Sequence, residues 1–544
     1  MKKKNFLSVA LLGLSLAALS GCGGKSGDAF YVAYFDGGYG ANWLETFVKE
    51  YLAQQKGVSP DQIVSGKDYR LVADADITYT AGNYVKSKRD CPDLLITNNL
   101  EAKLVSDGYI AGLSSLYEEE ITKMDGSKVK IKDYVDSSCA NRFYYEKQLG
   151  REASKDYWGI PWAAIPCSVA YNETLLQKIT HYDTNGTVEG LADGAKWTLP
   201  PETLNDVFTY FKDIDNYNAT APKKVDKFGW AGKDGTQWFE FMTMTWFAEL
   251  HGTANDKLSA GKYSSQGTFD DFWKLDAKAS TAEQYKWSGI QDALNAVKSL
   301  VTEDDGSQYG KYINSVMNAD AASIKDIQTK FADGDIALCL TGDWFEHEYK
   351  NSLDASGQVI KTMFVPSLDG AITRKEDGKV AKLTYLTTDN VMFVPANAPH
   401  KDTAFGLLKY MTEERQCIRF TQETGGIRPF DYDARNFESS IDPNFKYSNW
   451  QKSVFDIYYN ADDRISKFPR KSFAEEGTLS PVYVYEGDAG RTLTYGIEYP
   501  TVIDKLRKNS GVDIMVNGFD GNVENAAYSI AKKGFAEFES RYAE

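Results

Sequence analysis

The stretch FADGDIALCLTGDWFEHEY, residues 331–349, sets the fold class. Its centre, residues 336–340, is short and wholly apolar. Such a run is typical of a central strand in a sheet that is covered on both faces. Gly334 ends the helical pattern before the run, and the polar residues 341–343 follow it. The pattern therefore predicts a helix, a buried strand and then a loop that carries Trp344.

Strand and helix signals alternate along the rest of the chain. The segment AFYVAYFDGGYGANWLETFVKEYLAQQ (29–55) predicts a strand over 30–35, a glycine-rich loop and a helix with apolar residues at helical spacing. Further strands are predicted over 93–97, 167–171 and 390–394, each with a helix after it. This alternation predicts an α/β fold with a mostly parallel sheet that helices cover on both faces.

The first residues carry the features of an export signal. Three lysines at 2–4 precede an apolar segment over 6–19, which is too short to span a bilayer comfortably. The tetrapeptide LSGC ending at Cys22 resembles a bacterial lipoprotein box, which implies cleavage before Cys22 and lipid attachment to its thiol. The alternative is an ordinary signal peptide with a chance cysteine. We expect a signal peptide over 1–21 and a lipidated tether over 22–28.

Composition excludes some function classes. The formal net charge of −16 argues against nucleic acid as a partner, because the phosphates would be repelled. No later segment approaches the roughly 20 apolar residues of a transmembrane helix, so we expect a chain outside the membrane. The cysteines after Cys22 are scattered without metal-ligand spacing, so we expect no metal and no cofactor. The sequence does not decide whether Cys91 and Cys139 form a disulfide.

Five stretches, taken in order, carry a family resemblance. They are the lipoprotein box, FDGGYGANWL (35–44), PDLLI (92–96), GIPWAAIPCSVAYNETLL (159–176), and FADGDIALCLTGDW (331–344) followed by VPANAPHKDTAFGLLKYM and GGIRP (394–429). Each motif is weak alone. Their order resembles the extracellular solute-binding proteins of carbohydrate ABC importers, in particular the maltodextrin-binding group of family 1, over about residues 30–430.

The resemblance implies a fold of two α/β lobes, of the type II periplasmic-binding-protein kind, with a ligand cleft between the lobes. The implied division is 29–163 plus 382–429 for lobe 1 and 164–381 plus 430–544 for lobe 2. The chain would cross between the lobes near Pro161, near residue 381 and near Pro429. Residues 430–544 match no part of the family pattern in detail.

The implied function is capture of a sugar or oligosaccharide by lobe closure, with delivery to membrane permease subunits. We expect a monomer that is not an enzyme, held by the lipid on Cys22 at the outer or periplasmic face of the cell membrane. One alternative is a secreted, lipid-anchored glycosidase, which needs a carboxylate pair that no motif here presents. A glycan-capturing lipoprotein of the mainly helical class is disfavoured by the alternating strands.

Candidate ligand-binding residues come from loops that follow predicted strands, because ligands of open α/β sheets bind outside the carboxyl ends of the strands. Aromatic rings pack on the C–H faces of sugars. Carboxylates accept hydrogen bonds from sugar hydroxyls, and amides both accept and donate them. The candidates are Asp36, Tyr39, Asn98, Asn99, Trp162, Trp238 and Trp344.

Each candidate has a structural alternative. Trp344 is either a stacking platform or a buried cap on the following helix. Asp36 is also a turn residue, and Asn98 and Asn99 also suit helix capping. Trp162 fits cleft or core equally.

Other positions qualify the resemblance. Arg428 precedes a hinge proline, and we interpret it as structural. Trp246 is interpreted as a core residue, whereas Trp238 occupies the position of an aromatic subsite in relatives. Ile165 stands where maltodextrin-binding relatives carry an acidic residue, so the sequence does not name the ligand.

Overall fold

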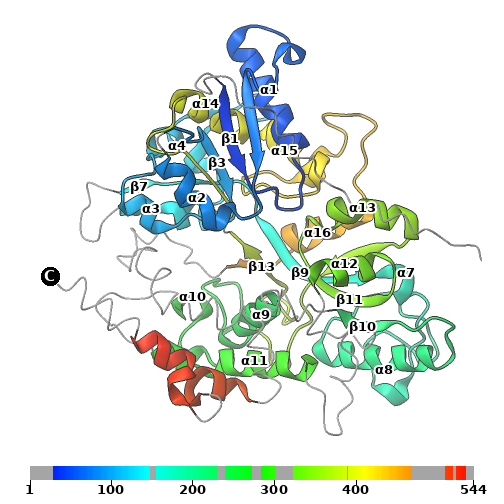
Figure 1. The fold of residues 1–544 in the computed structure, drawn as a ribbon. Helices are drawn as coiled ribbons and strands as arrows, with labels where there is room; N and C mark the ends of the chain where they lie inside the picture. Colours follow the sequence, from blue (N-terminus) through cyan, green and yellow to red (C-terminus); the bar gives the residue numbers. More distant parts are fainter. Residues whose placement is uncertain are drawn as a thin grey trace, which may run out of the picture.

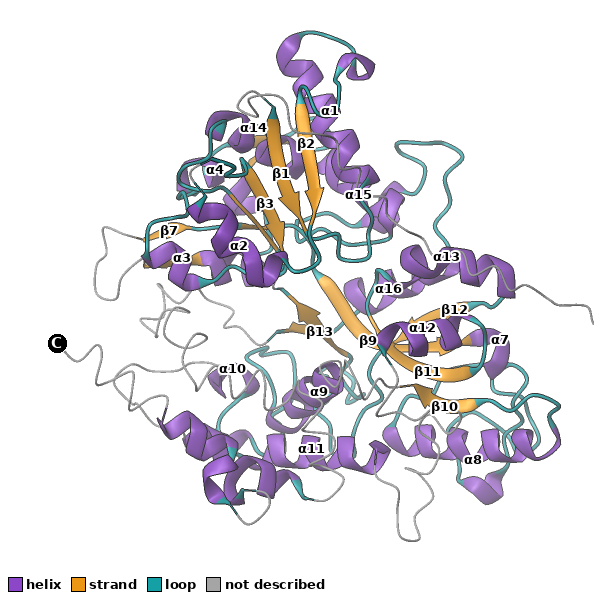
Figure 2. Cartoon of the chain, viewed as in Figure 1, coloured by secondary structure: helices purple, strands orange, loops and turns teal. Residues whose placement is uncertain are grey.

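The computed structural model describes residues 29–87, 89–146, 155–229, 239–272, 283–301, 323–388, 390–466, 509–518 and 522–533. The expected leader with Cys22, and Trp238, lie outside these residues. Two bodies are stacked one above the other, each built around a β-sheet (Figures 1 and 2). We call the body around the first sheet lobe 1 and the body around the second sheet lobe 2.

Lobe 1 contains a five-stranded sheet in the order β2-β1-β3-β14-β8. β1 runs parallel to β2 and β3, whereas β14 is antiparallel to β3 and β8. Its strands are β1 (Phe30–Tyr34), β2 (Tyr69–Ala73), β3 (Leu94–Thr97), β8 (Ile160–Pro161) and β14 (Val391–Phe393). Its longer helices are α1 (Asn42–Lys56), α2 (Ile77–Lys86), α14 (Lys401–Thr412) and α15 (Glu414–Thr424).

Helices cover both faces of the first sheet. Val32 packs in one apolar cluster with Leu44 of α1, while its neighbour Ala33 packs in a second cluster with Ile77 of α2. Successive strand residues point to opposite faces, so β1 is buried on both. Short elements complete the lobe: α3 (Ala102–Ser106), α4 (Ser114–Tyr117), α5 (Ile131–Tyr134), α6 (Ser137–Ala140), and the paired strands β4 (Glu120–Thr122) with β5 (Lys128–Lys130) and β6 (Tyr144–Glu146) with β7 (Lys155–Tyr157).

Lobe 2 contains a six-stranded sheet in the order β10-β11-β9-β13-β15, with β12 also paired to β9. The strands are β9 (Ile165–Asn172), β10 (Asp226–Gly229), β11 (Ile336–Thr341), β12 (Ile360–Met363), β13 (Leu383–Thr387) and β15 (Asp463–Ile465). The helices are α7 (Glu173–Leu176), α8 (Leu204–Thr220), α9 (Phe239–His251), α10 (Phe269–Phe272), α11 (Ser288–Val301), α12 (Ile324–Ala332), α13 (Phe345–Ser356) and α16 (Asn449–Tyr459).

The second sheet differs in one respect from the sequence prediction. β11 is fully buried, as its apolar run predicted. The expected mostly parallel pairing is wrong for this sheet, because β9 is antiparallel to β11, β12 and β13. β9 enters the sheet directly from the inter-lobe crossing.

The segments that cross between the lobes lie side by side. The chain enters lobe 2 between β8 and β9, and the backbone N–H of Ala164 donates to Ile427 O at 2.9 Å. It returns to lobe 1 between β13 and β14, where Asn390 O accepts from Trp162 N–H at 3.2 Å. This return is later than the crossing expected near 381, because β13 pairs with β9 in the second sheet.

Three further features concern the cysteines, metal ligands and helix lengths of the described residues. The five described cysteines are buried and form no disulfide, so Cys91 and Cys139 are not bridged. The described part of the chain has no group of three side chains placed to ligate a metal. Within the same ranges, no helix is both long and apolar enough to cross a bilayer.

A buried carboxyl on α9 makes stability depend on pH. Glu249 accepts a 2.9 Å hydrogen bond from the backbone N–H of Leu368, yet burial raises its pKa from 4.5 to about 8. The folded protein therefore binds this proton more tightly than the unfolded chain, and stability falls as pH rises from about 4.5 to about 8. We predict that Glu249→Gln raises Tm at about pH 8.5, since the cost of burying a charge disappears, with the advantage shrinking towards about pH 5.

The measurement is thermal unfolding at both pH values. A difference of 1 kcal/mol moves Tm by about 2–4 °C in a unit of 150–250 residues, so the effect is measurable. Glu189→Gln, at an exposed position, is the matched control and should change Tm little. An advantage of Glu249→Gln that is equal at the two pH values contradicts the assignment.

Candidate functional site

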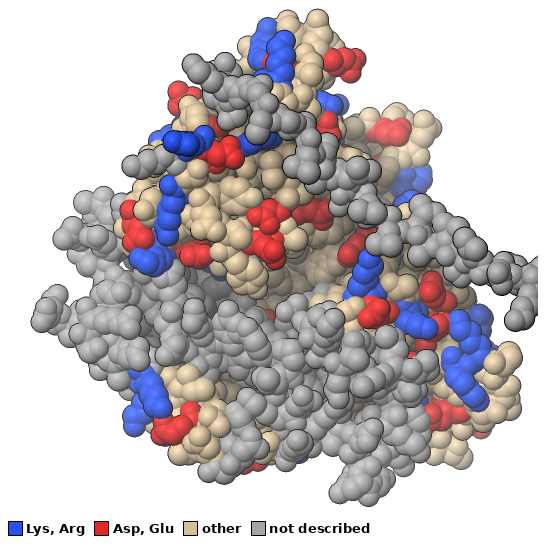
Figure 3. Space-filling model, viewed as in Figure 1, with Lys and Arg blue, Asp and Glu red and all other residues tan. Residues whose placement is uncertain are grey.

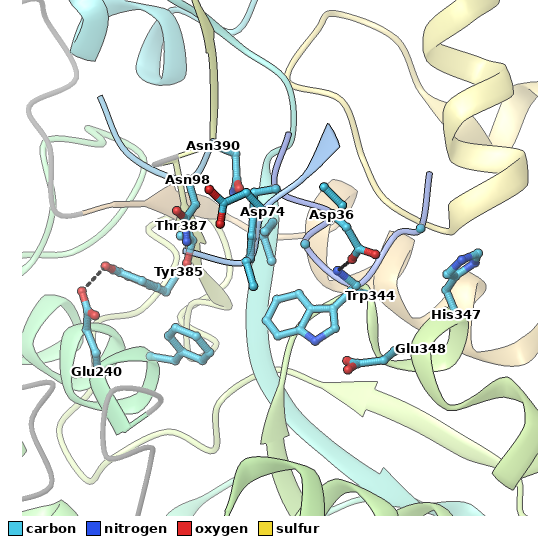
Figure 4. Close-up of a pocket in the computed structure, with 18 residues that line it drawn as sticks. Asp36, Asp74, Asn98, Glu240, Trp344, His347, Glu348, Tyr385, Thr387 and Asn390 are labelled. Atoms are coloured by element: carbon cyan, nitrogen blue, oxygen red, sulfur yellow. Dashed lines mark hydrogen bonds between the residues drawn. The ribbon is translucent and has the colours of Figure 1, made fainter. Parts of the chain in front are cut away.

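A cavity of about 900 Å³ lies between the lobes. Lobe 1 contributes loop residues that follow its strands: Asp36 after β1, Asp74 after β2 and Asn98 after β3. Because β1, β2 and β3 are parallel, their carboxyl ends meet at one edge of the sheet and bring these polar side chains together. Figure 4 shows Asp74 and Asn98 gathered at one end of the cavity.

Lobe 2 supplies the opposite wall. Glu240 and Phe241 come from the first turn of α9, and Trp344, His347 and Glu348 come from the start of α13. The strand β13 adds Tyr385, whose hydroxyl donates to Glu240 Oε1 at 2.5 Å, and Thr387. The dashed line between Glu240 and Tyr385 in Figure 4 marks this bond. The cavity therefore combines aromatic rings, carboxylates, amides and hydroxyls, and both lobes contribute polar side chains.

Trp344 is half-buried and lines the cavity. It immediately precedes α13, but its ring is not buried under that helix. Two glycines fix its place: a Cβ at Gly38 would come within 2.8 Å of Trp344 Cδ1, and a Cβ at Gly342 within 1.9 Å of its ring. The glycine-rich loop of lobe 1 thus packs against a ring of lobe 2, which leaves another part of the indole towards the cavity.

A buried carboxylate joins the lobes beneath this ring. Asp343 lies at the end of β11, and its Oδ1 accepts a 2.5 Å hydrogen bond from the Tyr39 hydroxyl of lobe 1. Its Oδ2 accepts from the backbone N–H of Ile427, also in lobe 1, at 3.3 Å. Burial raises the pKa of Asp343 from 3.8 to about 7, although these hydrogen bonds lower it. Tyr39 and Asp343 are both 1% exposed, so this link lies below the cavity surface.

The carboxyl groups of the cavity differ in their surroundings. Burial raises the pKa of Glu348, and the negative charge of Asp36 on the other lobe raises it further. Burial acts to raise the pKa of Asp74 as well, but hydrogen bonds from Asp76 N–H, Thr80 and Tyr84 lower it overall. Burial lowers the pKa of His347, which favours its neutral form.

The structure brings together three of the residues proposed from sequence. Asp36, Asn98 and Trp344 line the cavity. The Asp36 carboxylate also accepts from Gly38 N–H at 2.7 Å, so its turn role and its place on the cavity wall coexist. Trp238 lies outside the described residues.

Three other proposed residues do not line the cavity. Tyr39 is buried and its hydroxyl is bonded to Asp343. Trp162 is fully buried, stacks on Trp43 and donates its Nε1–H to Thr97 O at 3.0 Å. Asn99 is likewise not a lining residue, and its backbone N–H and carbonyl both bond the Thr97 hydroxyl. The two aromatic residues are core residues at the junction of the lobes.

Two residues interpreted as structural are buried. Trp246 is fully buried and donates its indole N–H to Pro366 O at 2.8 Å. Arg428 is fully buried between the rings of Phe420 and Phe430.

Several lining residues were missed from the sequence. Asp74 follows β2, a partly exposed strand without a clear apolar pattern. Tyr385 and Thr387 belong to β13, which was not predicted. Glu348 lies four residues after Trp344 on the same helix face, and this spacing was an available signal. Glu240 sits at the start of α9, where sequence gives no sign that a carboxylate faces a cavity.

A family model described as a bacterial extracellular solute-binding protein matches residues 87–446, about two thirds of the chain. A search of curated proteins gave no match.

Solved structures resemble the whole chain at low sequence identity. The GacH receptor of Streptomyces glaucescens, solved unliganded and with acarbose, matches at 14% identity and TM-score 0.56, covering 94% of this chain and 99% of that one. A solute-binding protein of Thermotoga lettingae bound to α-D-tagatose matches at 13% identity and TM-score 0.55, with the same coverage of both chains. RafE of Streptococcus pneumoniae, in complex with raffinose, matches at 14% identity and TM-score 0.53. The match again covers 94% of this chain and 99% of that one. The likeness confirms the predicted two-lobe α/β fold.

The contact between Gly38 and Trp344 gives a prediction. Gly38 has φ +84°, and an added methyl would clash with the indole. Gly57 has φ +64° but nothing within 4 Å of an added Cβ, so it carries the same backbone strain without the clash. We predict that Gly38→Ala costs about 1–3 kcal/mol more than Gly57→Ala, as overpacking does, and shifts the tryptophan emission spectrum. Equal costs in urea unfolding, with unchanged emission, contradict this packing.

The bond between Tyr39 and Asp343 gives a second prediction. Tyr39→Phe removes a donor to a buried carboxylate and should cost about 1–3 kcal/mol. Because the lost bond lowers the pKa of Asp343, the cost should be greater at about pH 8 than at about pH 6. Tyr117→Phe is the control, since Tyr117 donates to the carbonyl of Gly159 within lobe 1. Its cost should not change with pH, and a pH-independent cost for Tyr39→Phe as well contradicts the account.

Proposed function

The chain belongs to the bacterial extracellular solute-binding proteins, and we propose that it captures a sugar or oligosaccharide between its lobes and delivers it to the permease of an ABC importer. The observation that carries the sugar assignment is the Trp344 indole on the wall of the inter-lobe cavity, with hydrogen-bonding side chains from both lobes around it. The matched structures support the ligand class, since their bound ligands include acarbose, α-D-tagatose and raffinose.

The chemistry of the cavity suits a sugar. The flat C–H face of a pyranose packs on an indole, and its hydroxyls need acceptors and donors at fixed places. Asn98 and Thr387 offer both, while Asp36 and Glu240 offer carboxylate oxygens. A cavity of about 900 Å³ is within the range of small-molecule sites and has room for more than one sugar ring.

Binding is proposed to act through lobe closure. A ligand that touches both walls gains contacts only when the lobes approach, so it favours the closed arrangement. The crossing at 161–165, the crossing between β13 and β14 and the crossing after α15 would absorb the change in backbone angles. The first of them is already hydrogen-bonded to each of the other two, through Asn390 O and Ile427 O. We propose that the closed form is the one that the permease recognises.

The remaining parts of the proposal concern location and organisation. Cys22 would carry a lipid that holds the chain near its permease on the extracellular or periplasmic face of the membrane. We propose that it works as a monomer with lobe 1 formed by 29–163 and the segment from about 390 to 429, and lobe 2 by the rest of the mature chain. Mass spectrometry of Cys22 in membranes of the native host tests the lipid.

The prediction for function uses a matched pair of tryptophan variants. Trp344→Ala should remove most of the thermal stabilisation that a binding oligosaccharide gives, because it removes the stacking surface. Trp287→Ala is the control: Trp287 is also half-buried but packs on His251 and Phe272, away from the cavity. At about 100 times the Kd, binding contributes roughly 2.7 kcal/mol, which gives a measurable shift in the wild type.

Two outcomes would count against the proposal. A ligand-induced shift that survives Trp344→Ala excludes the stacking role. Recovery of cleaved sugar after incubation, in place of unchanged sugar, favours the glycosidase alternative.

A further inference from the structure

The lining of the cavity is acidic. Four carboxyl groups line it: Asp36 and Asp74 from lobe 1, and Glu240 and Glu348 from lobe 2. Among the described residues that line it, no lysine or arginine is present, and burial lowers the pKa of the one histidine, His347.

The two walls repel each other. Burial raises the pKa of Glu348 on lobe 2, the charge of Asp36 on lobe 1 raises it further, and the charge of Lys325 lowers it. Asp36 and Glu348 both line the cavity and are close enough for their charges to interact. Both lie near the Trp344 indole in Figure 4. Closure on a neutral ligand would bring these like charges together while removing water, which strengthens their repulsion. A positive charge between them would turn the same closure into an attraction.

The edge of lobe 1 beside the cavity has the same sign. Figure 3 shows Asp and Glu side chains gathered along the edge of lobe 1 that faces the hollow between the lobes. A cleft lined by one sign of charge concentrates ligands of the opposite sign and repels those of its own sign. Sugar acids and phosphorylated sugars are therefore poor ligands for this cavity.

We infer that the ligand is an aminated sugar, with a protonated amino group held between Asp36 and Glu348 beside Trp344. This inference rests on the proposed sugar-binding function and adds the charge of the ligand to it. Indole rings attract cations over their faces, and carboxylates accept strong hydrogen bonds from ammonium groups. The hydroxyls of the same sugar would meet Asn98 and Thr387 at the other end of the cavity.

The test compares ligands that differ in charge but little in shape. The probes are the glucosamine trisaccharide, its fully N-acetylated form, maltotriose, trigalacturonate and spermidine, titrated into the protein by calorimetry. The glucosamine trisaccharide should bind at least about tenfold tighter than its N-acetylated form, and added salt should reduce this preference. Trigalacturonate should not bind.

Charge-neutralising variants locate the effect. Asp36→Asn keeps an acceptor for Gly38 N–H and should abolish most of the preference for the amine, as should Glu348→Gln. Asp61→Asn removes an exposed carboxylate of the same lobe that does not line the cavity, and it should leave the preference unchanged.

The outcomes separate the two proposals. If maltotriose or the N-acetylated trisaccharide binds as tightly as the amine, the inference on charge is overturned while sugar binding stands. If spermidine binds and no sugar does, sugar binding itself is overturned and the aminated sugar with it. If the preference persists in both Asp36→Asn and Glu348→Gln, the amine is held elsewhere and the assigned site is wrong.

Discussion

The hydrogen bond from the Tyr39 hydroxyl to the buried Asp343 carboxylate joins two lobes that have separate sheets. Asp343 ends β11, and the next residue is Trp344, so the bond fixes the strand end that presents the indole. Tyr39 closes the loop that begins with Asp36 and Gly38. One contact therefore holds the cavity residues of the two lobes in register, and the same carboxylate also accepts the backbone N–H of Ile427 beside a crossing segment.

The site follows from this arrangement. Parallel strands of lobe 1 deliver Asp36, Asp74 and Asn98 to one edge, and α13 and β13 of lobe 2 face them. The aromatic residues differ in burial. Tyr39 and Trp162 are buried at the junction of the lobes, whereas part of the Trp344 ring lies on the cavity wall. The concentration of carboxylates costs solvation and repulsion, which a bound ligand of suitable charge offsets. The proposed ligand binding and the stability of the protein thus depend on neighbouring residues: Trp344 at the cavity wall, and Tyr39 and Asp343 below it.

Sequence patterns predicted the elements whose burial is complete. The run at 336–340 and the strand at 30–35 are apolar over their whole length, and both strands form within a residue of the expected bounds. β2 was missed because it is a partly exposed edge strand, and Asp74 was missed with it. Tyr39 and Trp162 could not be told from Trp344, since all three follow or flank strands. Whether each of them is buried in the core or lines the cavity depends on how the two lobes pack together. Local sequence does not indicate that packing.

The most direct test is a crystal structure of the protein after incubation with a mixture of neutral and aminated oligosaccharides. The account predicts a sugar ring against the Trp344 indole, touched from one side by the 36–40 loop and from the other by α13, with the bond between Tyr39 and Asp343 intact. A sugar bound on another surface, or a Trp344 side chain packed into the core away from the cavity, would contradict it.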